Sequence, residues 1–233
     1  MEETKWPARA VLPVAQPGLK FILMIILVTG MLFFAGWNLP AWIGVGAGVF
    51  VCWFFRDPDR KIPDTPGSLV SPADGKVIII EKMDKCDYLS MPCIKVSIFM
   101  NVFNVHVNRV PFSGVVEKVA YTHGKFFNAS FDKASTHNER NALVIRTDAG
   151  KRFAVVQIAG LIARRIVNCA RAGDTLTKGM RYGMIQFGSR LDVYLPEDST
   201  IAVQIGDKTS AGSTVIGYLN ETGTDGGDGT PER

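Results

Sequence analysis

The uncharged stretch from Phe21 to Phe55 constrains the fold more than any other feature of this 233-residue chain. Soluble surfaces rarely carry so long a run without a charge, so the run predicts contact with lipid. Asn38-Leu39-Pro40 divides it into two halves, each shorter than the roughly 20 residues of a typical spanning helix. Lys20 precedes the run and Arg56 follows it, and the positive-inside rule then places both ends in the cytoplasm.

We therefore expect residues 1–60 to form a helical hairpin at the cytoplasmic face of the cell membrane. Two alternatives stay open. A cleaved signal peptide would be shorter and would end in a small-residue exit site, which this run lacks before its second half. A buried core hairpin of a soluble fold is the other, because both halves are short.

Composition narrows the partners of the chain. Lys plus Arg exceed Asp plus Glu by 26 to 22, a balance that suits an anionic membrane surface. No basic run alternates with aromatic residues, so we expect no nucleic-acid partner. The four cysteines lack paired Cys-x-x-Cys spacing, and only three histidines are present. We expect reduced cysteines, a cytosol-facing protein and no metal site.

The chain beyond residue 60 has short apolar runs separated by Gly, Pro, Asp and Asn. Such runs, rich in Val, Ile and Phe, favour a mainly β fold, an antiparallel sandwich or barrel over residues 61–220. The expected strands are Lys76–Glu81, Ile94–Met100, Gly114–Tyr121, Ala142–Thr147, Arg152–Gly160, Met184–Phe187, Leu191–Leu195 and Thr200–Ile205. Leu161–Ala170 is the expected soluble helix. Residues 221–233, rich in Gly, Asp and Thr, are expected to be a disordered tail.

One Gly-Ser bond, Gly188-Ser189, lies between two of these strand-like runs. A Gly-Ser pair alone usually marks a turn. Here its surroundings, Arg181 to Pro196, resemble the self-cleavage site of a phosphatidylserine decarboxylase. Other segments match the short, bacterial or archaeal form of that family in the same order, so the resemblance covers residues 50–219. They are Phe55–Arg60, Ser71–Val77, Phe99–Pro111, Asn138–Asn141 and Gln157–Gly160.

The resemblance implies a proenzyme that cleaves itself between Gly188 and Ser189. Ser189 would become a pyruvoyl group, a cofactor made from the chain that forms a Schiff base with the substrate amine. Chains 1–188 and 189–233 would stay together as a heterodimer. The implied reaction converts phosphatidylserine into phosphatidylethanolamine and CO2. Such a reaction needs an electron sink, and the sequence has no dinucleotide-binding glycine motif that would point to another cofactor.

Two further residues complete the candidate catalytic set. A serine nucleophile needs a base, and the base needs an orienting partner. His106 and Asp74, both in segments that match the family, are the candidates for these roles. Longer family members carry a second histidine three residues after the first, whereas this chain has Arg109 there. Whether His106 acts in processing, in proton return or in both therefore stays open.

Several residues have weaker claims. Gly212-Ser213 resembles the cleavage motif of longer family members, but a break there would release little more than the tail. His123 and His137 are expected at the surface. Lys133 resembles a lipoylated lysine but lies in a polar loop rather than on a hairpin. Arg109 and Arg140 are equally suited to bind the substrate's anionic groups and to form structural salt bridges.

Three rival functions remain. The first is a pyruvoyl decarboxylase of a soluble amino acid, which would gain nothing from an apolar anchor. The second is a serine hydrolase that uses Ser189, His106 and Asp74 and keeps its chain intact. The third is a non-catalytic module, because residues 201–217 resemble the hairpins of lipoyl and biotin carrier domains. That last resemblance also suggests a barrel-sandwich hybrid for the β core.

Overall fold

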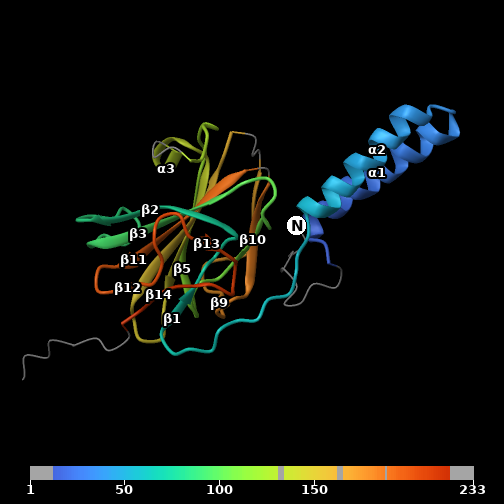
Figure 1. The fold of residues 1–233 in the computed structure, drawn as a ribbon. Helices are drawn as coiled ribbons and strands as arrows, with labels where there is room; N and C mark the ends of the chain where they lie inside the picture. The colour runs from blue at the N-terminus through green and yellow to red at the C-terminus, as the bar shows by residue number, and fades with distance from the viewer. Residues whose placement is uncertain (1–12, 131–133, 162–164, 187, 221–233) are drawn as a thin grey trace, which may run out of the picture.

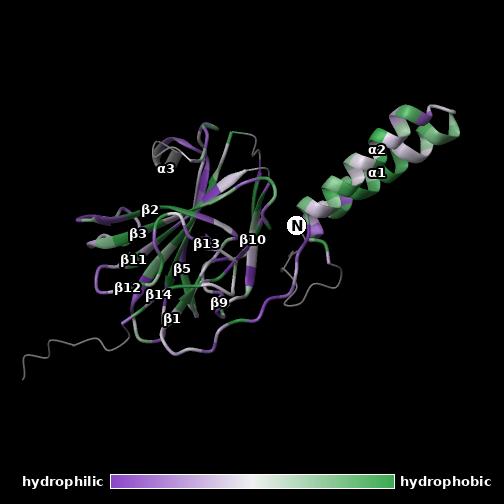
Figure 2. Cartoon of the chain, in the orientation of Figure 1, coloured by the Kyte–Doolittle hydropathy of each residue, from purple (hydrophilic) through white to green (hydrophobic). Residues whose placement is uncertain are grey.

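The computed structural model describes residues 13–130, 134–161, 165–186 and 188–220. Two antiparallel helices, α1 (Gln16–Phe34) and α2 (Asn38–Phe54), project from a β body as a long hairpin (Figure 1). Their outer surface is almost wholly apolar (Figure 2). Of the described helices, α1 is long and apolar enough to cross a membrane, with a mean hydropathy of 2.1, and α2 is shorter.

The helical hairpin turns earlier than the sequence suggested. Its turn lies at residues 35–37, where Gly36 has φ of +76°, a conformation that glycine adopts without strain. The expected break, Asn38-Leu39-Pro40, instead forms the first turn of α2. Proline is tolerated there because the first backbone N–H groups of a helix have no intrahelical acceptor. The lengthened α1 includes Lys20.

Beyond the hairpin the chain forms three antiparallel sheets. The eight-stranded sheet has the order β13 (Lys208–Thr209), β2 (Gly75–Met83), β3 (Cys93–Met100), β11 (Ser189–Pro196), β7 (Arg152–Ala159), β6 (Arg140–Arg146), β5 (Gly114–Thr122) and β9 (Thr175–Leu176). Two three-stranded sheets have the orders β1 (Ser68–Val70), β14 (Val215–Tyr218), β12 (Thr200–Ile201), and β4 (Val107–Arg109), β10 (Arg181–Gln186), β8 (Arg165–Asn168). The large sheet curls into a half-barrel (Figure 1). A short helix, α3 (Ala134–His137), lies above it.

The expectation of a mainly β fold is confirmed. Seven of the expected strands match β2, β3, β5, β6, β7, β10 and β11 along most of their lengths, and Thr200–Ile205 is a strand only over Thr200–Ile201. Phe187, the last residue of the expected Met184–Phe187 strand, lies outside the described residues, as does the expected tail 221–233. The predicted helix over Leu161–Ala170 is wrong. Its described part contains β8, whose Ile166 and Val167 pair with β10, because strand pairing supplies backbone partners that local periodicity does not reveal.

Alternate side chains of β11 enter different layers. Leu191, Val193 and Leu195 belong to the main core inside the half-barrel. Arg190, Asp192 and Tyr194 are also buried. Tyr194 belongs to a second apolar cluster with Cys86 and Leu89. The central strand is therefore covered on both faces, which holds its first residue, Ser189, rigidly.

The base of the helical hairpin packs on the β body. Phe54 and Phe55, both fully buried, form a third apolar cluster with Val105, Val107 and Met184. Burial of these two phenylalanines contributes about 1.5–3 kcal/mol each. The hairpin is thereby fixed beside the loop between β3 and β4.

Candidate active site

Ser189 is the first residue of β11, in the middle of the large sheet. It pairs with Met100 of β3 on one side and with Ala159 of β7 on the other. Its side chain has no exposed surface, and Oγ lies 3.9 Å from the Met100 sulfur. A thioether is only a weak acceptor, so within the described part of the chain the Ser189 hydroxyl has no strong hydrogen-bond acceptor.

The bond before Ser189 lies where the chain changes sheets. β10 belongs to a three-stranded sheet and β11 to the large sheet, so the expected strand–Gly-Ser–strand arrangement is present but is not a simple hairpin. Gly188 has φ of +73°, in the left-handed region that favours glycine. Its carbonyl oxygen accepts a hydrogen bond from the Gly160 N–H at 3.1 Å.

His106 follows the loop after β3 and is fully buried. Nδ1 lies 2.9 Å from the Asn104 carbonyl oxygen, so Nδ1 carries the proton and Nε2 is the acceptor. The ring lies against Phe54, with 4.2 Å between ring centroids. Burial and, to a smaller extent, the positive charge of Arg56 together lower the pKa of His106 to about 4, against the opposing effect of the Asn104 carbonyl. No hydrogen-bond partner of Nε2 occurs among the described residues.

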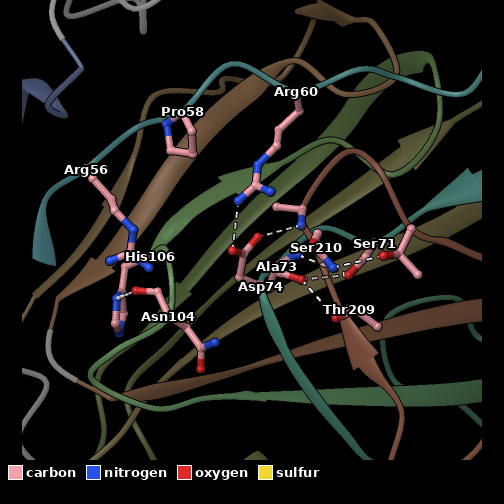
Figure 3. Close-up of polar contacts among 12 residues, drawn as sticks. Arg56, Pro58, Arg60, Ser71, Ala73, Asp74, Asn104, His106, Thr209 and Ser210 are labelled. Atoms are coloured by element: carbon pink, nitrogen blue, oxygen red, sulfur yellow. Dashed lines mark hydrogen bonds and ion pairs between the residues drawn. The ribbon is translucent and has the colours of Figure 1, made fainter. Parts of the chain in front are cut away.

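Asp74 lies just before β2 and is largely buried. Oδ2 accepts a charged hydrogen bond from Arg60 at 2.9 Å, and Oδ1 accepts the Ala211 N–H at 2.7 Å (Figure 3). Arg56 interacts electrostatically with both candidate residues. Its positive charge lowers the pKa of His106, and the negative charge of Asp74 raises the pKa of Arg56. Burial outweighs Asp74, so the pKa of Arg56 is lowered overall.

The fold brings the three candidate residues to one end of the large sheet. Phe99 of β3 pairs with Lys76 on one side and Arg190 on the other, so Asp74 and Ser189 lie near the starts of strands two positions apart. That separation is about 10 Å between strand backbones. His106 lies on the segment that leaves the same end of β3.

The hydrogen bonds of these three residues differ from the expected arrangement. Within the described part of the chain, no hydrogen bond joins Asp74 to His106 or either of them to Ser189. The expected orienting role of Asp74 toward His106 is taken in this structure by the Asn104 carbonyl, and Figure 3 shows these as separate contacts. Such contacts can tighten when a site is engaged, so geometry in the free chain does not remove a candidate.

A buried ion cluster accounts for Arg109. Its guanidinium donates to the Gly179 and Pro58 carbonyl oxygens, at 3.0 and 2.9 Å, and lies 3.6 Å from Asp57. Arg181 binds the same Asp57 at 2.8 Å. The structural alternative for Arg109 is therefore favoured, since its donors point at protein acceptors rather than at an open site.

Sequence reasoning missed a row of buried amides beside Ser189. Asn141 donates to Gln157 at 3.1 Å, Gln157 donates to Asn108 at 2.9 Å, and Asn108 lies 3.7 Å from the Met100 sulfur. All three amides are at least 98% buried. The sequence signal for this row was the presence of polar residues at inward positions of apolar strands. Buried polar groups cost stability unless each is hydrogen-bonded.

Arg190 and Asp192, also missed, form a buried pair on the other face of β11. Arg190 Nε lies 2.7 Å from Asp192 Oδ1, and neither side chain has exposed surface. Arg190 also donates to the Ala129 carbonyl and to Ser135. Arg190 thereby links Ala129 and Ser135 to the strand that begins at Ser189.

The remaining candidates make contacts with other groups, are exposed, or lie outside the described residues. Ser213 is in the turn before β14, where its N–H donates to the Ser210 carbonyl at 3.1 Å. His123 and His137 are exposed. Arg140 donates to the Asn138 carbonyl at 3.4 Å. Lys133 lies outside the described residues.

The described residues offer no alternative centre for metal chemistry. No group of three His, Cys, Asp or Glu side chains that could hold a metal ion occurs within them. The four cysteines are free thiols. A hollow of about 650 Å³ lies at the opposite end of β11, beside Pro196 and Glu197, far from Ser189.

Known proteins identify the family. The sequence model described as phosphatidylserine decarboxylase matches residues 47–217. The phosphatidylserine decarboxylase proenzyme of Syntrophus aciditrophicus is 50% identical over 205 residues, which are 88% of this chain and 96% of that protein. The proenzyme of Desulfotalea psychrophila is 47% identical, covering 89% and 97%, and that of Cupriavidus taiwanensis 54%, covering 79% and 84%. The chain, with its buried serine at a change of sheet, thus belongs to the phosphatidylserine decarboxylase family.

Proposed function

We propose that this enzyme decarboxylates phosphatidylserine to phosphatidylethanolamine with a pyruvoyl group that it makes by cleaving itself between Gly188 and Ser189. The observation that carries the proposal is the Gly188–Ser189 bond itself. It lies at a change of sheet, with Gly188 in a conformation suited to glycine and its carbonyl already hydrogen-bonded. Ser189 is buried, and among the described residues its hydroxyl contacts only the weak acceptor Met100. A nucleophile that must leave its resting position benefits from such weak contacts.

Self-cleavage begins with the Ser189 hydroxyl. Oγ loses its proton to a base and bonds to the Gly188 carbonyl carbon, and the C–N bond then breaks as the nitrogen is protonated. The product is an ester between Gly188 and Ser189. Loss of the Ser189 α-proton expels the Gly188 carboxylate and leaves dehydroalanine. Water then releases ammonia, so chain 1–188 ends in a carboxylate and chain 189–233 begins with the pyruvoyl group.

His106 is the base we assign to proton transfer. Its pKa of about 4 keeps the imidazole neutral at physiological pH, and its unpartnered Nε2 is the nitrogen that can accept a proton. Asp74 acts electrostatically in this arrangement, because its charge opposes the cations Arg56 and Arg60 beside the site. The position of Asp74 at the same end of the sheet supports that role.

The pyruvoyl carbonyl supplies the electron sink for loss of CO2. The chain's own residues hold and shield that position. Met100 lies beside the Ser189 hydroxyl and also contacts the Asn108 amide, which is bonded to the buried row of Gln157 and Asn141. The complete burial of Ser189 keeps water from this position.

The helical hairpin of residues 1–60 supplies the membrane anchor in this proposal, and residues 61–220 the catalytic unit. A 19-residue α1 is about 28 Å long, close to the hydrocarbon thickness of a bilayer. Arg56 and Arg60 at its base mark the cytoplasmic side. Since Phe54 contacts His106, the anchor ends at the active site and brings lipid headgroups to it.

Intact mass under denaturing conditions tests the proposal. The wild-type protein should yield two chains that break between residues 188 and 189, the smaller with a blocked amino terminus. The Ser189→Ala protein should remain one chain and be inactive on phosphatidylserine vesicles. An unblocked amino terminus at Ser189 would show simple hydrolysis instead. An intact, active wild-type chain would favour the serine hydrolase, and equal activity on free serine would favour the soluble-substrate enzyme.

A further inference from the structure

We infer that the backbone N–H of Gly160 is the oxyanion donor of self-cleavage and that Asn138 is the positioning residue that fixes its peptide. The inference rests on the proposed cleavage between Gly188 and Ser189, and deepens it. It assigns a task to Asn138 and Gly160, which the chemistry above leaves without one.

The key contact is already present before cleavage. The Gly160 N–H donates to the Gly188 carbonyl oxygen with a donor–acceptor distance of 3.1 Å. That oxygen belongs to the carbonyl that Ser189 attacks. Ser189 itself pairs with Ala159, the residue before Gly160, so the β7–β11 ladder sets the register that brings donor and acceptor together.

The charge change in the first step explains the value of this donor. As Ser189 Oγ bonds to the Gly188 carbon, the π electrons of the C=O move to its oxygen, and its negative charge grows. A hydrogen bond to a charged acceptor is roughly twice as strong as one to a neutral acceptor. The contact therefore stabilises the tetrahedral state more than the intact peptide, which is the requirement for a faster step. Collapse of that state returns the electrons to the carbonyl and breaks the C–N bond.

Residue 160 must be glycine for this contact to exist. A Cβ at this position would lie 2.3 Å from the Gly188 oxygen and 3.0 Å from its carbonyl carbon. Both distances are below any normal van der Waals contact. Position 160 therefore requires a residue without a side chain, because it lies against the carbonyl of the scissile bond.

Asn138 holds the other end of the same peptide unit. Its Nδ2 donates to the Ala159 carbonyl at 2.7 Å and to the Phe127 carbonyl at 2.8 Å, and its Oδ1 accepts the Phe127 N–H at 3.1 Å. The side chain is fully buried. The Ala159 carbonyl and the Gly160 N–H belong to one planar peptide. Fixing the carbonyl aims the N–H, and a hydrogen bond to the carbonyl also polarises it.

The first test is the rate of cleavage in Gly160→Ala protein. Loss of one oxyanion donor slows catalysis by about 10²–10³-fold, and we expect a slowdown of that order in the appearance of the two chains. The matched control is Gly114→Ala. There the new Cβ would lie 2.4 Å from the Arg146 carbonyl oxygen, an equal clash in the same sheet but away from Ser189, and cleavage should proceed at the wild-type rate.

A second variant removes the donor without adding bulk. Glycolic acid at position 160 replaces the amide N–H by an ester oxygen. The same replacement at Gly150, whose N–H donates to the Thr147 carbonyl at 2.9 Å in a surface turn, is its control. We expect slow cleavage for the first and normal cleavage for the second. Cleavage at the wild-type rate with glycolic acid at position 160 would overturn the inference even if Gly160→Ala failed to fold.

Hydroxylamine separates the steps and tests Asn138. It cleaves an ester that has already formed, so it should not rescue Asn138→Ala or the position-160 variants, in which the ester forms slowly. Rapid rescue would show that the ester forms normally and would overturn the assigned role. If the wild-type chain stays whole, the proposed function itself fails. If it cleaves and the variants cleave equally fast, only the present inference fails.

Discussion

Acidification should leave His106 neutral down to a pH near 4. The ring is fully buried, it packs on Phe54, and Arg56 adds a nearby positive charge. Burial and the Arg56 charge each disfavour imidazolium, and burial is the largest cause. The Asn104 carbonyl, which accepts the Nδ1 proton, opposes them without reversing the shift.

The shift has a consequence for stability with a definite sign. The folded-state pKa of about 4 lies below the ordinary value of 6.5, so the unfolded chain binds this proton first. Stability is therefore fully present above pH 6.5 and is lost as pH falls toward 4. At about 1.4 kcal/mol per pKa unit, the loss between pH 7.5 and 4.5 amounts to roughly 2 to 3 kcal/mol.

Nuclear magnetic resonance of ring-labelled histidine measures the pKa directly. Only three histidines are present, and the Ser189→Ala protein in detergent micelles keeps the chain whole. His106→Asn identifies the signal and preserves a donor to the Asn104 carbonyl. Urea unfolding of both proteins between pH 7.5 and 4.5 then gives the free energy. Between pH 7.5 and 4.5, the difference in unfolding free energy between the two proteins should change by the roughly 2 to 3 kcal/mol derived above. In the resonance spectra, exposed His123 serves as the internal reference.

A His106 signal that titrates near pH 6.5 would refute this reasoning. So would a stability difference between the two proteins that is independent of pH. Arg56→Gln provides a second check, since removing the cation should move the pKa of His106 upward. An unchanged pKa in that variant would remove Arg56 from the electrostatics of the site.

Three further predictions concern the nucleophile, the anchor and the buried ion pair. Ser213→Ala should cleave normally, while Ser189→Ala stays whole on a denaturing gel. If both proteins stayed whole, the result would contradict the assignment. Replacing the exposed Leu23 and Leu27 of α1 by Gln should shift protein from the high-salt membrane pellet to the supernatant with cleavage intact; unchanged pelleting would locate the anchor elsewhere. Asp192→Ala leaves the buried Arg190 without its carboxylate and should lower the free energy of unfolding by about 3–5 kcal/mol, which urea titration checks; a loss below 1 kcal/mol would contradict this burial.

Local patterns were sufficient for much of the fold. Short apolar runs rich in Val, Ile and Phe predicted β2, β3, β5, β6, β7 and β11, because these side chains favour strands. The uncharged run from Phe21 to Phe55 predicted the apolar helices, because so long a run without a charge indicates contact with lipid. Boundaries were less accurate, as at Gly36, where a single left-handed residue ends α1. Motifs in sequence order were enough to single out Ser189.

The family, the strand content and the candidate nucleophile could be predicted from the amino-acid sequence, because each is encoded in neighbouring residues. Which groups meet depends on the tertiary structure. In the folded chain, Gly160 lies against the Gly188 carbonyl, and Phe54 packs on the His106 ring. Asp74 binds Arg60 rather than His106. The tertiary structure also made β8 a strand through its pairing with β10. Such contacts join residues far apart in the chain, and their selection depends on the packing of the whole β body, which no local pattern records.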